Sequence, residues 1–397
     1  MADNRNFISR LLFKKPEQKS EIIQVFKKEV STSNSFDITT DYGVPYTSVF
    51  KTSKGYLFGV DGFYPQQLNL LYTNSPLHSA IINFKKLLAV GNGISIEDFE
   101  KADAKTKIAI NQLSVQFEEM LSDITLDLII HNTIAIEVYW NSDYSKIVKI
   151  ERVSPEKIRI NDVNEKMEPI SFLYNWDWVN STRYPTKELK VFSPLHKKER
   201  CQLLYFQVKS PGMKLYAEPT YQSALPWVIL DAEMAQYHKA NIINSLNPSM
   251  LIQYFEKPGS AEEKQQVLFD INNSFAGARK TGRAMITFSD GKELAPTVTQ
   301  MEPNKLDKTF LQLTDTIQRQ ICYAHGIDPQ LLGLKTPGSL GNSGEIAYAY
   351  DIFNASQIQP IQKEIEKVFN KLMVSNGLAN KIKLNEPTIT LISQTKA

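Results

Sequence analysis

The sequence predicts an α+β fold in which long amphipathic helices precede and follow a block of short strands. Before residue 132 and after residue 306, apolar residues recur at spacings of three and four, the period of a helix with one buried face. Between residues 135 and 208 the pattern changes to alternating β-branched and aromatic residues, which is typical of strands. With 42% hydrophobic and 22% charged residues, the chain can bury a sizeable core.

Two helices are expected ahead of the strands. The first begins with Ser75 as its N-cap and Pro76 at the first helical position, and it ends at the glycines of segment 91–93. The second covers roughly 103–132. Residues 1–60 are polar, with Ser and Thr clusters and breaks at Gly43 and Pro45, so we expect an N-terminal arm with little regular structure.

The strand block opens with a hairpin, because two alternating runs, 135–140 and 146–153, flank a polar turn. Further strands are expected at 158–160, 170–174 and 203–208.

The second half of the chain returns to helices. A helical stretch runs from 220 to 244, with Pro226 expected to kink or restart it. A mixed insert at 248–305 contains strands near 250–255 and 284–288 and a helix between them.

A clean amphipathic helix at 306–325 leads into a Gly/Pro-rich loop at 326–344. A long helix at 345–373 follows, and Pro360 is expected to kink it. A final strand is expected at 388–392.

Charge and cysteine content exclude several classes of protein. There are 45 basic and 43 acidic side chains, whereas a protein that grips duplex DNA usually carries a clear basic surplus. A repressor or nuclease is therefore disfavoured. Cys201 and Cys322 form no CxxC pair and are too few for a zinc site. No run of about 18 apolar residues occurs, so we expect no membrane-spanning segment, and no signal peptide is evident.

Three glycine patterns resemble catalytic or nucleotide-binding motifs without matching them. The loop 326–344 lacks a Gly-Lys-Ser/Thr ending and a leading strand, so it is no P-loop. Gly91 and Gly93 begin a dinucleotide fingerprint that Ile96 breaks. Segment 341–344 lacks the spacing of a nucleophile elbow. No acid–base pair or triad can be assembled, so we predict no enzyme activity, no cofactor and no metal.

Several polar residues have two interpretations. Asp127 and His131, four apart on a helix, could share a metal, but a local hydrogen bond or salt bridge is the more common arrangement. For His238 and His325 we expect solvated or capping side chains. The basic cluster Arg279, Lys280 and Arg283 is either a solvated turn or a contact to DNA or a partner.

The order of segments resembles the portal protein family of tailed double-stranded-DNA phages. The resemblance runs from about Leu68 to Met373. The segments that carry it are the Ser-Pro helix 75–93, the helix-to-strand passage 127–140, Val-Ser-Pro-Glu-Lys-Ile-Arg at 153–159, the helix ending in Asn-Ser-Leu-Asn-Pro-Ser at 244–249, and Ala-His-Gly-Ile-Asp-Pro-Gln-Leu-Leu-Gly at 324–333 with the loop after it.

The resemblance implies an architecture for each part of the chain. The fold would be a portal-type α+β fold: an N-terminal arm (1–60), a wing (61–219), stem helices (220–247 and 306–326), a small mixed α/β clip (248–305), a tunnel loop (327–344), and a long kinked wing helix with a C-terminal strand (345–397).

It also implies site residues. The tunnel loop would meet DNA through Lys335, Thr336, Ser339, Asn342 and Ser343. The polar side of the second stem helix would be Asp307, Gln312, Asp315, Gln318 and Arg319. The cluster Arg279, Lys280 and Arg283 would dock the partners of the clip.

The function implied is that of a ring subunit, usually one of twelve, at the portal vertex of the virion. The ring would conduct double-stranded DNA during packaging and ejection. Its partners would be the terminase large subunit, the major capsid and scaffolding proteins, and later the head–tail connector, with no membrane and with assembly in the bacterial cytoplasm. The alternative is a cytosolic α/β enzyme with a Gly-rich lid at 326–344. A different connector ring is disfavoured because such adaptors are usually much shorter.

Overall fold

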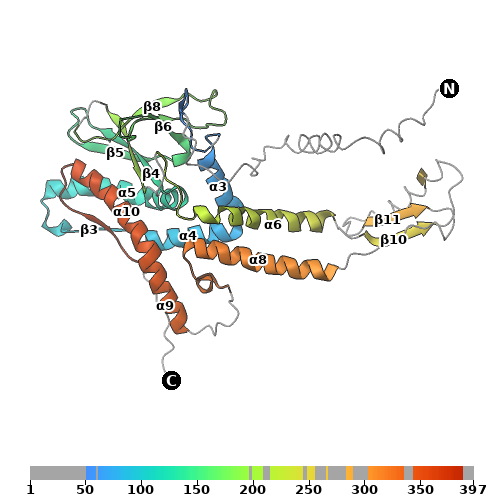
Figure 1. Cartoon of the computed structure of the whole chain (residues 1–397). Coiled ribbons are helices and arrows are strands. Elements are labelled where there is room, and N and C mark those ends of the chain that lie inside the picture. Colours follow the sequence, from blue (N-terminus) through green and yellow to red (C-terminus); the bar gives the residue numbers. More distant parts are fainter. Residues whose placement is uncertain are drawn as a thin grey trace, which may run out of the picture. The chain divides into compact units, whose positions relative to one another are not determined.

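The computed structural model describes residues 51–59, 61–195, 199–208, 215–244, 248–254, 265–266, 283–288, 303–334 and 343–387. All of them lie in the second of two compact units, residues 43–397, into which the chain divides. They form a mixed α+β fold, as the sequence predicts (Figure 1).

Both long helices ahead of the sheet begin at a side-chain cap, and the cap of the first was predicted. In α4 (Pro76–Val90), the Ser75 hydroxyl accepts a hydrogen bond from the backbone N–H of His78 at 3.3 Å. Asp103 caps α5 (Ala104–His131) in the same way. Each cap satisfies backbone donors that the first helical turn leaves without partners. A further helix, α3 (Tyr64–Asn74), was not predicted, although Pro65 in its first turn is a start signal.

One sheet organises this part of the molecule. Its strand order is β5-β4-β9-β8-β7-β6, and all neighbours are antiparallel except the parallel pair β8 and β9. The strands are β4 (Thr133–Trp140), β5 (Ile147–Arg152), β6 (Ile158–Val163), β7 (Pro169–Tyr174), β8 (Lys187–Val191) and β9 (Cys201–Gln207). The sequence predicted all of these strands except β8, which reads Lys-Glu-Leu-Lys-Val and buries only Leu189.

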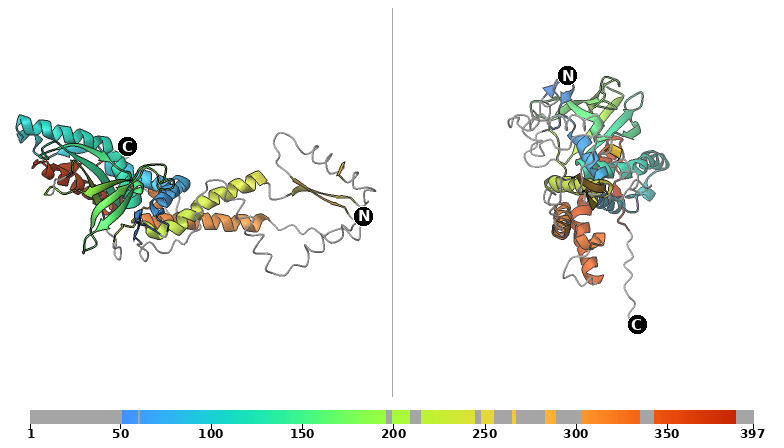
Figure 2. Two further views of the ribbon diagram at one scale, coloured as in Figure 1. Left: turned by 90° about the horizontal axis from the view of Figure 1, so that it is seen from above. Right: turned by 90° about the vertical axis from the view of Figure 1, so that its right-hand side faces the viewer.

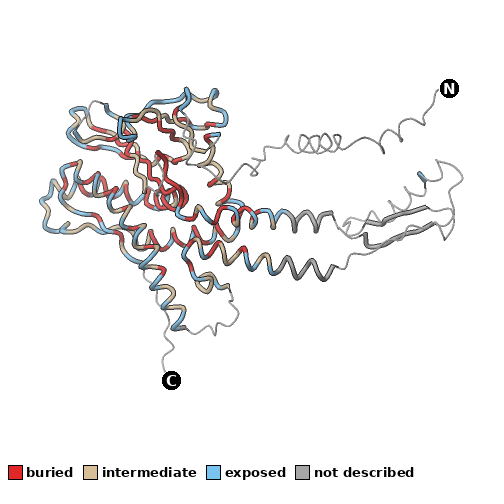
Figure 3. Tube along the Cα trace, in the orientation of Figure 1, coloured by how far each residue is buried: buried red, intermediate tan, exposed pale blue. Residues whose placement is uncertain are grey.

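The larger core lies between this sheet and the helices α5 and α10 (Gln359–Ser375). On β4, Ile134, Ile136 and Val138 alternate toward these helices, as the two-residue period of a strand requires. The rings of Phe117 and Phe369 stack with centroids 4.2 Å apart and join the two helices. Figure 3 shows buried positions concentrated where α4 and α5 meet the sheet.

A second cluster covers the opposite face of the sheet. It contains Phe172 and Tyr216, and the ring of Phe58 stacks on Tyr216 with centroids 4.6 Å apart. Strands β1 (Lys51–Thr52) and β2 (Gly55–Tyr56) form a short hairpin beside it. Gly55 has φ +83°, and a Cβ there would lie 2.7 Å from the Ile160 carbonyl oxygen. The last residues of the expected N-terminal arm are therefore packed on the sheet.

Two short strands join distant parts of the chain. The strands β3 (Ile94–Ile96) and β12 (Ile382–Leu384) pair antiparallel. Gly91, in a left-handed conformation, lies so close to the Asn385 backbone that any side chain would clash. Gly91, which begins the broken dinucleotide pattern of the sequence, thus makes room for the chain after β12.

The remaining elements follow the predicted order. The short helix η3 (Gln222–Ala224) precedes α6 (Leu225–Asn244), and Pro226 lies in the first turn of α6, where the helix restarts. The strands β10 (Pro248–Tyr254) and β11 (Arg283–Phe288) pair parallel. The helix α8 (Pro303–His325) precedes η5 (Pro329–Leu332).

The last long helix is not uniform. It consists of α9 (Ser343–Phe353), a π-helical segment (Asn354–Ile358) and α10, which has Pro360 in its first turn. Proline has no N–H to donate to the preceding turn, and π segments are places where helices bend. A kink at Pro360 stays a prediction. The strand expected at 388–392 lies outside the described residues.

Candidate functional site: the stem helices and their junction with the sheet domain

The two expected stem helices, α6 and α8, pack against each other (Figures 1 and 2). In α8 the buried residues Ile317, Ile321 and Cys322 follow the helical period, so the apolar side faces protein. Within the described part of the chain, no helix has both the length and the apolar character needed to cross a bilayer.

The predicted polar side of α8 is mixed in charge. Gln312 and Asp315 are exposed, and Gln318 and Arg319 are half-buried. Arg319 forms an ion pair with Asp315 one turn earlier, with nitrogen and oxygen 2.9 Å apart. Asp307 lies in α8, but its side chain is outside the described ones. The described stripe therefore neutralises its own charge instead of presenting a cationic surface.

A cleft of about 260 Å³ connects this stripe to the beginning of the Gly-rich loop. It is lined by Asp315, Gln318 and Arg319 of α8 and by Asp328 and Gln330 of the loop. The Asp328 carboxylate accepts a hydrogen bond from the Gln330 backbone N–H at 2.9 Å, which caps η5. The structure thus brings the predicted stem residues together with the start of the predicted tunnel loop.

The side chains of the other predicted residues lie outside the described ones. Lys335, Thr336, Ser339 and Asn342 lie outside the described residues, and Ser343 begins α9. In the segment expected to be the clip, Arg279 and Lys280 also lie outside the described residues, and Arg283 begins β11. The roles of these residues stay predictions.

The base of the stem is tied to the sheet domain by a buried serine–aspartate contact. The Ser75 hydroxyl donates a hydrogen bond to the Asp231 carboxylate of α6 at 2.6 Å. Ser75 is fully buried, and its oxygen also caps α4. One side chain therefore fixes both the start of α4 and the position of α6 against it.

A second tie is a buried histidine pair that the sequence pattern did not predict. Nδ1 of His78 in α4 lies 2.9 Å from Nε2 of His325 at the end of α8, so one ring donates and the other accepts. Tyr221 packs against both rings, with centroid distances of 4.6 and 4.9 Å. His325 was expected to be solvated or capping. That prediction is wrong, because α4 and Tyr221 cover the ring.

The electrostatics of this junction favour neutral side chains. Burial, with a smaller effect of the nearby Lys85, lowers the pKa of His78 to about 3 and brings the pKa of His325 well below its usual range. Burial also lowers the pKa of the Lys85 ammonium to about 8. The pair is therefore an uncharged polar contact at neutral pH.

Asp127 has a different partner from the one considered in the sequence. Its carboxylate accepts two hydrogen bonds from Arg152 of β5, at 2.7 and 2.6 Å. Burial raises the pKa of Asp127, and the guanidinium opposes that rise. Among the residues that the structure describes, no cluster of three His, Cys, Asp or Glu side chains could hold a metal ion.

Comparison with known proteins identifies the family. A sequence model described as "Phage portal protein" matches residues 113–392, well over half of the chain, and this range includes α6, α8 and the loop between η5 and α9. No curated protein sequence matches the chain.

Two solved structures have a similar fold. One is a chain from the neck of an empty GTA particle, computed with C6 symmetry, at 14% identity and a TM-score of 0.54 over 81% of this chain and 84% of that one. The other is from the neck of a native GTA particle, computed with C12 symmetry, at 14% identity and a TM-score of 0.50 over 80% and 83% of the two chains. The chain belongs to the phage portal protein family.

Proposed function

We propose that this chain is a subunit of a ring that forms the channel for DNA at the portal vertex of a phage-like capsid. The observation that carries the proposal is the family match across 113–392, which includes two helices packed side by side, α6 and α8. Helices from successive subunits would then line a common channel, as cyclic symmetry allows. The C12 symmetry of the GTA neck particle makes twelve copies our working number.

The composition of the α8 stripe supports a conduit for DNA. A wall dense in lysine would hold a polyanion through counterion release, whereas Asp315 and Arg319 neutralise each other. A near-neutral wall would let the duplex slide. The tunnel loop residues Lys335, Thr336, Ser339, Asn342 and Ser343 would make the contact with DNA.

The partners follow from this role. The clip, with Arg279, Lys280 and Arg283, would dock the terminase large subunit during packaging and the head–tail connector afterwards. The wing would contact the major capsid and scaffolding proteins during assembly in the bacterial cytoplasm. Packaging energy would come from the terminase ATPase, and the ring itself would carry out no catalysis.

The test is the mass of the purified protein in solution, measured together with negative-stain images of the same fractions. We expect closed rings of about twelve copies with a central hole wide enough for duplex DNA. A chain that stays monomeric at every concentration, and also in the presence of its scaffolding protein, would refute the proposal.

A further inference from the structure

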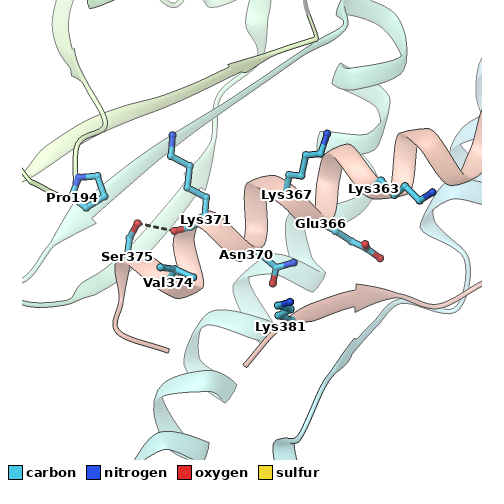
Figure 4. A pocket seen from close by; sticks show the side chains of 9 residues that line it. All are labelled: Pro194, Lys363, Glu366, Lys367, Asn370, Lys371, Val374, Ser375 and Lys381. Atoms are coloured by element: carbon cyan, nitrogen blue, oxygen red, sulfur yellow. Dashed lines mark hydrogen bonds between the residues drawn. The ribbon is translucent and has the colours of Figure 1, made fainter. Parts of the chain in front are cut away.

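The outward side of α10 carries a basic stripe that ends in an apolar residue. Lys363, Lys367 and Lys371 recur at intervals of four, and Val374, one turn beyond Lys371, is 70% exposed. Figure 4 shows Lys367 and Lys371 projecting from the same side of α10. They border a groove of about 730 Å³ that Pro194 and Val374 also line. The groove thus combines ammonium groups with apolar surface.

The outward side of α5 carries the opposite combination. Residues 108–131 contain no Lys or Arg, and the exposed stripe holds Val115, Glu119 and Asp123. Val115 is 53% exposed, and Ile108, two turns earlier, is 61% exposed. An apolar half is therefore followed along α5 by an acidic half.

The two stripes lie on opposite flanks of the same helical layer. The helix α5 packs on β4 and on β5, the edge strand of the sheet. The helix α10 lies toward the other side, where Lys371 is 5.9 Å from the Phe192 ring and the groove reaches Pro194, just after β8. Different surfaces on opposite flanks suit a head-to-tail contact, which closes into a ring when the rotation between subunits allows it.

We infer that α10 of one copy packs antiparallel on α5 of the next copy. Along α10 the order is Lys367, Lys371, Val374, and against the direction of α5 it is Asp123, Glu119, Val115. At about 1.5 Å per residue, the two sets span about 10.5 and 12 Å, so both carboxylates meet ammonium groups while the two valines meet each other. Within one copy Lys367 lies 2.6 Å from the Glu364 carboxylate. Asp123 lies 3.8 Å from the Arg152 guanidinium of its own chain. The contact between copies would therefore give Lys367 and Asp123 a second partner of opposite charge. The occupant of the lysine groove is thus a second copy of this chain. This inference rests on the proposed ring.

The first test is cross-linking of the predicted valine pair. The double variant V115C/V374C, treated with a short bismaleimide, should give a ladder of covalent multimers up to the size of the ring. V115C and V374C alone should stop at dimers, and the wild-type chain gives the background from Cys201 and Cys322. A double variant that shows no more than the sum of the single variants would overturn the inference.

The second test is a charge exchange. The acidic-groove variant is K367E/K371E, and the basic-helix variant is E119K/D123K. Each should lose most of its rings, because α10 of one copy and α5 of the next then carry charges of the same sign. An equimolar mixture of the two variants should restore rings in which they alternate. The variant with all four substitutions should form rings without a partner. K146E/K166E, at exposed lysines outside both stripes, should behave as wild type.

The outcomes separate this contact from the ring itself. If K367E/K371E and E119K/D123K both form rings in wild-type yield, the contact is refuted and the ring stands. The same holds if the loss of rings in these variants is reversed neither by mixing them nor by combining all four substitutions. Ladders from V115C/V374C in a protein that forms no closed ring would support the contact and refute the ring. The absence of both ladders and rings would refute both.

Discussion

The ion pair between Asp127 and Arg152 predicts a destabilisation that depends on pH. The Asp127 side chain is 5% exposed, and Arg152 donates both of its hydrogen bonds from the neighbouring strand. Arg152→Met keeps much of the apolar part of the side chain but leaves the Asp127 carboxyl without these donors. Two charge-assisted hydrogen bonds at about 1.5 kcal/mol each stabilise the ionised form by about 3 kcal/mol, which is about two pKa units.

The sign follows from the direction of the shift. Burial already raises the pKa of Asp127 to about 7, and without Arg152 it would rise to about 9. A group whose pKa is raised by folding loses its stabilising contribution as the pH rises through the folded value. Wild type therefore stops losing stability from Asp127 near pH 7, while Arg152→Met continues to lose it up to about pH 9.

The assay is thermal unfolding of wild type and variant at pH 6 and pH 9. The gap between their midpoints should be about 3–4 °C wider at pH 9, because the unfolding entropy of a chain of 397 residues makes about 3 kcal/mol correspond to roughly that shift. The control D127N/R152M has no carboxyl to titrate at this position. Its midpoint should therefore differ from that of the single variant D127N, which lacks the same carboxyl, by the same amount at pH 6 and pH 9. Arg183→Met, at an exposed arginine, should lie within about 0.5 kcal/mol of wild type. An equal gap at both pH values for Arg152→Met would refute the reasoning.

Three further predictions concern the proposed channel and the core. Deletion of residues 335–343 should leave ring formation intact and reduce DNA packaged per particle; loss of rings would show that the loop is not a channel element. Charge reversal at Arg279, Lys280 and Arg283 should weaken binding of the terminase or connector in a pull-down, and unchanged binding would make the cluster a solvated turn. Phe369→Ala should cost about 3–5 kcal/mol in unfolding free energy, because the ring is fully buried against α5, and a loss below about 1 kcal/mol would contradict the packing.

Local signals along the chain were sufficient for most elements. The Ser75 cap and the alternating apolar pattern of β4 predicted element type and boundaries, because a cap or a period acts within a few residues. The order of these segments also predicted the family that the match over 113–392 shows. Asp328 lies in a segment that carries the resemblance, whereas Asp315 lies in the helix before it, and only the structure shows that the two line one cleft.

What the sequence could not predict depends on contacts between distant residues. The strands β3 and β12 are three residues long, too short to show a period, and each is a strand only because it pairs with the other. His325 and His78 are 247 positions apart, and nothing local distinguishes a buried histidine from a solvated one. The sequence by itself determined the long helices, most strands and the family. The tertiary structure decided which polar side chains are buried, because burial depends on the segments that the fold brings over them.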